Sequence, residues 1–244
     1  AFDYPLFPDH PNNYHERLIL RSGGGSWSEM PFRDEFAQSL IKDISDVAIQ
    51  YHRSAVVFIN GEYWGVERLR ERYDDNYLKN QYGVENADIL ENEGVVKEGS
   101  NQTYLELLEY LKAEDLNAPG RYDWIRARMD VENFRDYHIA ETFCMAIDQP
   151  GRNSDLWRSQ TIDPANPYAD GRWRWLLLDL DSSFGYEPYA PYDRNALVFN
   201  TGLNDIDATT VNPKSDQPAS APNTPSATLP LRRMLSNLEF RRDF

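Results

Sequence analysis

Runs of apolar residues that end at turn-forming residues divide the chain into strand and helix candidates. The clearest strand pattern is residues 52–72, where two β-branched and aromatic runs flank Asn60-Gly61. Both residues of that dipeptide accept positive φ, so the pattern predicts a β-hairpin. Residues 17–21, which precede Gly23-Gly24-Gly25, are also strand-like. The glycines are expected to make a flexible turn, with a phosphate cradle as the alternative.

Between these strand candidates, residues 28–42 have apolar side chains at helical spacing. Ser28 can cap a helix, and Pro31 suits its first turn. The expected buried face consists of Phe32, Phe36, Leu40 and Ile41. The charged residues at 33–35 are expected to be solvated or to cap the helix. The alternative is that one of the acids pairs with a Lys that binds nucleotide phosphates.

The region that follows predicts mainly helices. A short helix is expected from Asp74 to Tyr82, an acidic loop at 85–100 and an amphipathic helix around 104–111. Asp130 is a suitable N-cap for a long helix that ends near Cys144. His138 is expected in the core or at the surface rather than in catalysis, and the later Trp173 and Trp175 are expected in the core or at an interface.

Strand candidates return after the long helix. Residues 156–158 and 173–178 would place Asn153 at the start of one strand and Asp179 at the end of the other. Residues 186–230 predict irregular structure, because five prolines with Ser, Thr and Asn between them occur from 213 to 230, and the segment 209–230 is linker-like. Residues 231–244 have the pattern of a basic amphipathic helix.

Length and charge narrow the possible classes of protein. A chain of 244 residues fits one large domain or two lobes. Its net charge of −15 disfavours a nucleic-acid partner, because such proteins carry a basic surface. The single cysteine, Cys144, excludes an internal disulfide. No apolar run is long enough to predict a membrane span.

Two apolar runs end at acidic residues whose order and spacing suit phosphoryl transfer. One ends at Asp148, and Asn153 follows five positions later; the other ends at Asp179, and Asp181 and a Phe-Gly pair follow. A kinase-type site uses one carboxylate for the proton of the attacking hydroxyl, and an amide oxygen plus a second carboxylate for metal ions. Either motif alone also fits an ordinary turn or a capping pattern.

Four stretches resemble the CotH family, the spore-coat-protein kinases. They are Phe2–Phe7, Met30–Phe36, Val56–Gly65 and the region from Asp148 to Gly185. The phrase Phe-Ile-Asn-Gly-Glu-Tyr-Trp-Gly, followed by Leu-Arg-Glu-Arg at 69–72, is the most distinctive. The resemblance implies an α+β, atypical protein-kinase-like fold across 1–244. A small β-rich N-lobe would comprise residues 1–72, and a larger, mainly helical C-lobe residues 73–244.

The resemblance also implies roles for the motif residues. Asp148 matches the catalytic acid, Asn153 and Asp179 match ligands of the metal and nucleotide, and Asp181 matches a further acid of the metal motif. The expected cofactors are ATP and Mg²⁺. The expected partner is a protein with Ser or Thr hydroxyls, and a secreted, cell-surface or spore-coat location is expected. Asp148, Asn153 and Asp179 are expected to meet in one cleft between the lobes.

The sequence departs from ordinary kinases in two respects. Ala146-Ile147 stand where His-Arg usually precedes the catalytic acid, and Lys42 is the only lysine before the end of the hairpin. One hypothesis is that the chain is a fragment whose phosphate-binding Lys lies upstream, on a missing strand. The alternative is that Arg17, Arg21 or Lys42 replaces it.

Two other functions fit the same residues. The first is a pseudokinase or surface-binding module without turnover, which the missing His-Arg and Lys support. The second is a glycan hydrolase that uses a pair of carboxyl groups.

Overall fold

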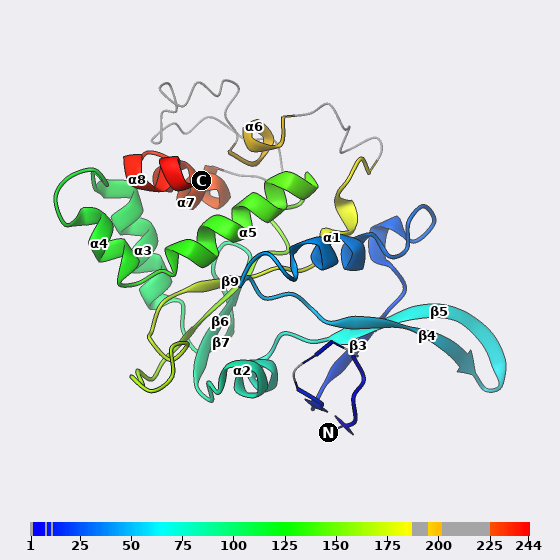
Figure 1. The fold of residues 1–244 in the computed structure, drawn as a ribbon. Coiled ribbons are helices and arrows are strands. Elements are labelled where there is room, and N and C mark those ends of the chain that lie inside the picture. Colours follow the sequence, from blue (N-terminus) through cyan, green and yellow to red (C-terminus); the bar gives the residue numbers. More distant parts are fainter. Residues whose placement is uncertain (1, 8, 11, 187–194, 202–224) are drawn as a thin grey trace.

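The α+β composition predicted from the sequence is confirmed. The computed structural model covers residues 1–244 and describes all of them except 1, 8, 11, 187–194 and 202–224. A three-stranded sheet lies at one end of the molecule, and most helices, with a second sheet, lie toward the other end (Figure 1).

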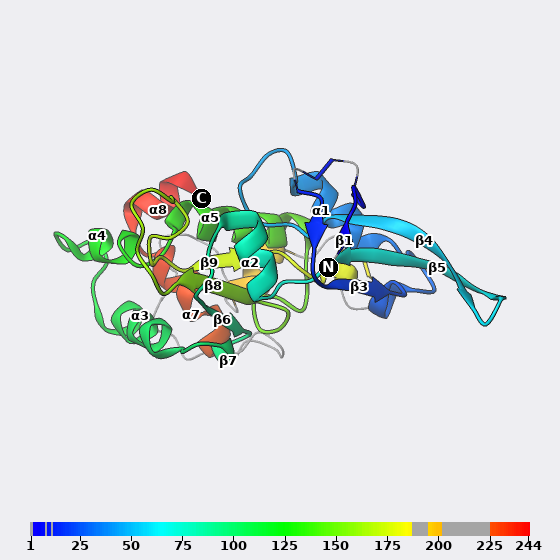
Figure 2. The same cartoon turned by 90° about the horizontal axis from the view of Figure 1, so that it is seen from below.

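The first sheet contains the predicted hairpin. Strands β4 (His52–Ile59) and β5 (Glu62–Glu71) pair antiparallel around Asn60-Gly61, and β3 (Leu18–Arg21) pairs with the other edge of β5. The outer part of the hairpin extends away from the rest of the protein (Figure 2) and exposes large apolar side chains. These are Val56, Phe58, Ile59, Tyr63, Trp64 and Val66. A short pair, β1 (Phe2–Asp3) and β2 (Tyr14–His15), precedes this sheet.

The second sheet corrects one prediction. The acidic segment at 85–100 forms two strands, β6 (Ala87–Glu91) and β7 (Val95–Glu98), rather than a loop. They join β8 (Asp155–Ser159) and β9 (Arg174–Leu176) in the order β7-β6-β8-β9. Ile89 and Leu90 are almost completely buried on opposite faces of β6. The burial of these two apolar side chains stabilises a strand here, although acidic residues surround them in the sequence.

Helices cover this second sheet. The first of them in the chain is α2 (Asp75–Tyr82), which the Asp74 side chain caps as predicted. The others are α3 (Gln102–Ala113), α4 (Arg121–Arg126), α5 (Val131–Cys144) and α6 (Ala196–Thr201). Asp130 caps α5 through the backbone N–H of Asn133, as predicted. The core between α5 and the sheet includes the buried Trp173 and Trp175, and His138 is also buried.

The C-terminal region differs from the prediction of one helix at 231–244. It forms α7 (Pro225–Met234) and α8 (Leu238–Asp243). The break lies at Asn237, whose side chain accepts a hydrogen bond from Phe240 N–H and so caps a new helix. Most of the predicted irregular segment 209–230 lies outside the described residues, but residues 225–230 are helical. The described part of the chain contains no helix that is long and apolar enough to cross a membrane.

Helix α1 (Arg33–Ile41) is oriented opposite to the prediction. The expected inner residues Phe32, Phe36 and Leu40 are 48%, 41% and 38% exposed, and of the predicted face only Ile41 is buried. The charged residues at 33–35, which were expected in solvent, are buried instead. The side chains of Arg33 and Asp34 have polar partners in the strands and turns beneath α1, so hydrogen bonds and ion pairs stabilise part of this face.

Candidate active site

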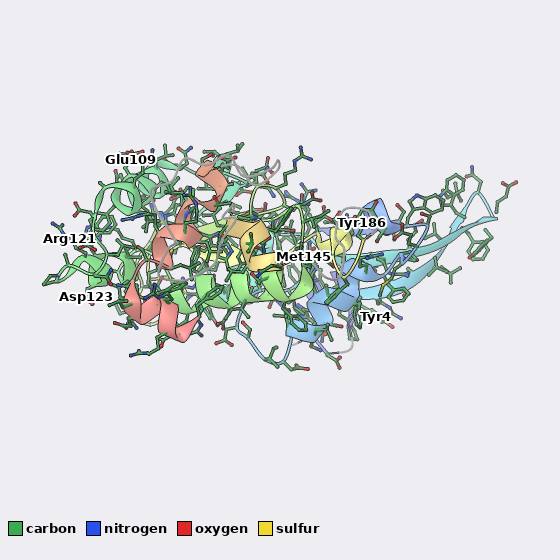
Figure 3. The ribbon with its side chains drawn as sticks, turned by 90° about the horizontal axis from the view of Figure 1, so that it is seen from above. Tyr4, Glu109, Arg121, Asp123, Met145 and Tyr186 are labelled. Atoms are coloured by element: carbon green, nitrogen blue, oxygen red, sulfur yellow. The ribbon has the colours of Figure 1, made fainter. Side chains whose placement is uncertain are left out.

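The loop that bears Asp148 and the turn that bears Asp179 lie side by side. The backbone N–H of Ile147 donates to the carbonyl of Ser182 over 3.3 Å. The side-chain amide of Gln149 donates to the carbonyls of Leu178, at 3.1 Å, and Asp179, at 3.3 Å. Residues 145–153 and 178–182 are therefore held together, although they are distant in the sequence. Figure 3 places Met145 and Tyr186, which border these segments, between the hairpin and the helical end.

The backbone of these two segments is unusual. Met145, Asn153, Asp179 and Phe184 all have positive φ, between 48° and 55°. A non-glycine residue rarely adopts this conformation, and such residues gather at functional sites, where the surrounding structure holds them. Asp179 stands at the start of a short 3₁₀ turn, η2 (Leu180–Ser182), so its unusual φ directs the turn that carries Asp181.

Asp179 and Asp181 meet at one cation. The same nitrogen of Arg21, Nη2, donates to Oδ1 of Asp179 and to Oδ2 of Asp181, the latter over 3.0 Å. The backbone N–H of Gly25 also donates to Oδ2 of Asp181, over 2.5 Å. Because the two carboxylates lie close enough to share one guanidinium nitrogen, their negative charges could attract another cation at the same place.

Of the cations proposed to replace a missing Lys, only Arg21 contacts these acids in the described residues. Arg17 pairs with Asp74 over 3.1 Å. Lys42 pairs with Asp9 over 3.0 Å. Arg21 is the last residue of β3, so the first sheet directly supplies a side chain to the candidate site.

Asp34 of α1 connects three parts of this region. One oxygen, Oδ1, accepts from the backbone N–H of Leu180 and from the side chain of Gln38, each over 2.8 Å. The other, Oδ2, accepts from Arg70 of β5 and, over 3.4 Å, from Arg21. Asp34 is only 3% exposed. The solvated role predicted for it is wrong, and its cation partners are Arg21 and Arg70 rather than a lysine.

The glycine turn was predicted as a flexible connection, but it lies against the acids. A Cβ atom on Gly24 would overlap Oδ2 of Asp181 and Nη2 of Arg21, so these side chains would have to move. Gly23 and Gly24 also have positive φ, at 97° and 60°. Close approach and backbone geometry therefore favour glycine at positions 23 and 24. A triple glycine directly after a strand is the sequence signal that pointed here.

Opposite charges are concentrated around this point. Three guanidinium groups and four carboxyl groups come from β3, β5, α1 and the segment around η2. They are Arg21, Arg68, Arg70, Asp34, Glu35, Asp179 and Asp181. The sequence pattern does not mark Arg68 or Arg70 as site residues, because an arginine within a strand gives no distinct signal of a site.

Burial affects the protonation of two of these acids. It raises the pKa of Asp179, and the neighbouring Arg21 guanidinium opposes that rise. Burial also raises the pKa of Glu35, whose two carboxyl oxygens have no hydrogen-bond partner within the described residues. Both acids thus lie in surroundings that disfavour bare negative charge and favour an added cation.

The other two predicted site residues are half-buried. Their segment is closed by a backbone hydrogen bond of 2.7 Å from Arg152 N–H to the Asp148 carbonyl. Within the ranges that the structure describes, no hydrogen bond or ion pair engages the side chains of Asp148 or Asn153. The two side chains therefore remain available to a substrate or a metal ion.

The donor set suits Mg²⁺ better than a transition metal. Among the described residues there is no group of three or more His, Cys, Asp or Glu side chains placed to hold a metal ion. Mg²⁺ is commonly bound by one or two carboxylates, with water and substrate phosphates as its other ligands. The paired oxygens of Asp179 and Asp181 on one guanidinium nitrogen fit that requirement.

Comparison with known protein families gives one match. Residues 10–244 match the family described as CotH kinase protein; the match includes Asp148, Asn153, Asp179 and Asp181, and the stretch Phe2–Phe7 lies before it. A search of the curated proteins found no match.

Proposed function

The chain belongs to the CotH kinase protein family, and from this membership and the site geometry we propose that it is an ATP- and Mg²⁺-dependent protein kinase. It would transfer the γ-phosphoryl group to Ser or Thr hydroxyls of a protein substrate. The family membership supports a kinase-like phosphotransferase, and the narrower substrate class is our proposal. A substrate at the cell surface, outside the cell or in a spore coat is part of the same proposal.

One observation carries the proposal: the loop with Asp148 is hydrogen-bonded to the turn with Asp179. The contacts from Ile147 to Ser182 and from Gln149 to Leu178 fix the two motifs relative to each other. Phosphoryl transfer depends mainly on the positions of an attacking hydroxyl, metal ions and phosphates. A rigid link between the two motifs supports that positioning.

Each motif residue has a proposed task. When bound, Mg·ATP would supply the phosphoryl group, and the metal would offset its charge. Asp179 and Asp181 would hold the metal through their carboxylate oxygens, with Asn153 as a further oxygen donor. Asp148 would orient the substrate hydroxyl and accept its proton. Asp34 is not expected to touch substrate; it holds α1 against the turn that carries Asp181.

We further propose that the first sheet with α1 corresponds to the small lobe of a kinase, and that the helices with the second sheet correspond to the large lobe. The site lies where Arg21 of the first sheet meets the turn after β9. Nucleotide would enter between these two parts.

The direct test is incubation of the protein with γ-labelled ATP and a Ser- and Thr-containing protein, with and without Mg²⁺. Mg²⁺-dependent label on the substrate or on the kinase itself supports the proposal. Binding of Mg·ATP without any transfer would instead identify a pseudokinase. Absence of both binding and transfer would rule out both the kinase and the pseudokinase hypotheses.

The Asp148→Asn variant should mainly lose turnover. The amide keeps the size of the side chain but cannot accept the hydroxyl proton, so we expect a decrease of about 10²- to 10⁴-fold in the rate of transfer. Mg·ATP affinity, measured by calorimetry, should change little, because the proposed role of Asp148 begins with the hydroxyl. A variant that keeps full turnover would exclude Asp148 from the mechanism.

A further inference from the structure

The inner face of the first sheet bears arginines in register. Arg21 of β3 and Arg68 of β5 are directly opposite each other, and Arg70 lies two residues further along β5. Paired residues in an antiparallel sheet, and residues two apart in a strand, point to the same face. All three guanidinium groups therefore lie on the face that meets α1. Arg53 of β4 pairs with Leu69 and belongs to the opposite face.

The three arginines differ in their partners. Arg70 is committed to the buried carboxylate of Asp34. Arg21 divides its two terminal nitrogens between Asp34 and the pair of acids Asp179 and Asp181. Arg68 is only 8% exposed, and its Nη1 has no hydrogen-bond partner in the part of the chain that the structure describes.

A buried guanidinium without a hydrogen-bonded anion is costly, because it has lost water and gained little in return. The charge of Glu35 interacts with Arg68 and Arg70, but burial raises the pKa of Glu35 and disfavours its ionised form. Its oxygens form no hydrogen bond within the described residues. Arg68 can therefore still donate a hydrogen bond to an anion that binds beside Arg21.

The glycine turn adds a backbone donor at the same place. Gly25 N–H points at Oδ2 of Asp181, the same oxygen that accepts from Arg21 Nη2. The close approach of Gly24 to that oxygen leaves no room for a side chain between the turn and the acids. Backbone N–H groups in a glycine turn are effective phosphate donors.

We propose that Arg21 and Arg68, with Gly25 N–H, form the site that binds the nucleotide phosphates; this inference rests on the kinase function proposed above. If Asp179 and Asp181 held a divalent ion, Arg21 Nη2 and Gly25 N–H would no longer donate to those oxygens. Both donors would then be available to phosphate oxygens, while Arg21 Nη1 would keep its bond to Asp34. A guanidinium matches a phosphate through two parallel hydrogen bonds.

This arrangement predicts two effects of opposite sign for one substitution. Arg21→Met removes a cation that competes with Mg²⁺ for Asp179 and Asp181, so the affinity for Mg²⁺ alone should rise. The same variant removes a phosphate ligand, so the affinity for Mg·ATP should fall by about 10- to 100-fold. Arg68→Met should lower Mg·ATP affinity to a smaller extent and leave Mg²⁺ binding nearly unchanged, because it contacts neither acid.

Calorimetric titration of the whole chain with MgCl₂ alone and with Mg·ATP measures both effects. Arg53→Met is the matched control, since it removes an arginine from the same sheet on the opposite face, and both affinities should stay as in the unmodified protein. Arg21→Lys should recover part of the Mg·ATP affinity through its charge. Thermal unfolding of each variant identifies any that fails to fold, and Arg21→Lys and Arg68→Met then carry the test.

Three outcomes would overturn the inference. If Arg21→Met binds Mg·ATP as tightly as Arg53→Met does, the phosphates lie elsewhere, although the kinase function can stand. If both affinities of Arg21→Met fall together, Arg21 supports the fold rather than binding phosphate. If the unmodified chain binds no Mg·ATP, the proposed function fails and this inference fails with it.

Discussion

Asp179→Ala is expected to abolish Mg²⁺-dependent ATP binding and phosphoryl transfer. Asp179 shares a cation site with Asp181, and the loss of one of two carboxylates removes half of the protein's negative charge on the metal. Electrostatic groups that act directly on the transferred phosphoryl group contribute factors of about 10² to 10³ each. We therefore expect at least that decrease in transfer rate, together with a loss of Mg·ATP binding, measured with labelled ATP and by calorimetry.

Asp123→Ala is the control for this substitution. Asp123 is exposed in α4, at the helical end of the molecule and far from Tyr186 (Figure 3). Its replacement should leave binding and transfer unchanged. Comparison with Asp148→Asn separates the steps, since that variant should keep Mg·ATP binding and lose turnover. Retention of full Mg·ATP binding by Asp179→Ala would remove Asp179 from the metal site.

Asp34→Ala is expected to cause the largest loss of stability. Asp34 and Arg70 are both almost completely buried, so the substitution leaves a buried guanidinium without its anion. Removal of one partner of a buried ion pair typically costs about 3–5 kcal/mol. The backbone N–H of Leu180 and the side chain of Gln38 also lose an acceptor. We expect a decrease of this size in the free energy of unfolding, measured by urea denaturation.

Asp9→Ala is the matched comparison. Asp9 also forms an ion pair, with Lys42 over 3.0 Å, but its side chain is 77% exposed. Exposed pairs contribute about 0–1 kcal/mol because water and salt screen them. If the two variants lost similar free energies of unfolding, burial would not be the reason that the Asp34 ion pair stabilises the protein. If Asp34→Ala does not fold, Asp34→Asn retains an oxygen acceptor for Leu180 and should be intermediate.

Local signals in the sequence predicted the elements that local interactions determine. Asn60-Gly61 defined the hairpin turn, Asp74 capped α2, and Asp130 capped α5. In each case the residues that decide the structure are neighbours in the chain. The order of Asp148 and Asp179 was likewise readable, because each follows an apolar run.

The orientation of α1 could not be predicted in this way. Periodicity indicates which residues share a helix face, but it assumes that the apolar face turns inward. Here the inward face is charged, because Arg21 and Arg70 arrive from strands 13 and 36 positions away from Asp34. Such partners become visible only once the sheet register is known. For the same reason, no sequence pattern marks Arg68 as a residue of the site.

The exposed outer part of the β4–β5 hairpin affects the behaviour of the protein in solution. Along residues 54–59, β4 has no charged residue or proline to protect its edge, and such edges tend to pair with other chains. The net charge of −15 keeps molecules apart, but the range of that repulsion falls from about 10 Å at 0.1 M salt to about 3 Å at 1 M. Concentrated salt should therefore favour aggregation that begins at the hairpin, whereas dilute buffer should keep the protein dispersed.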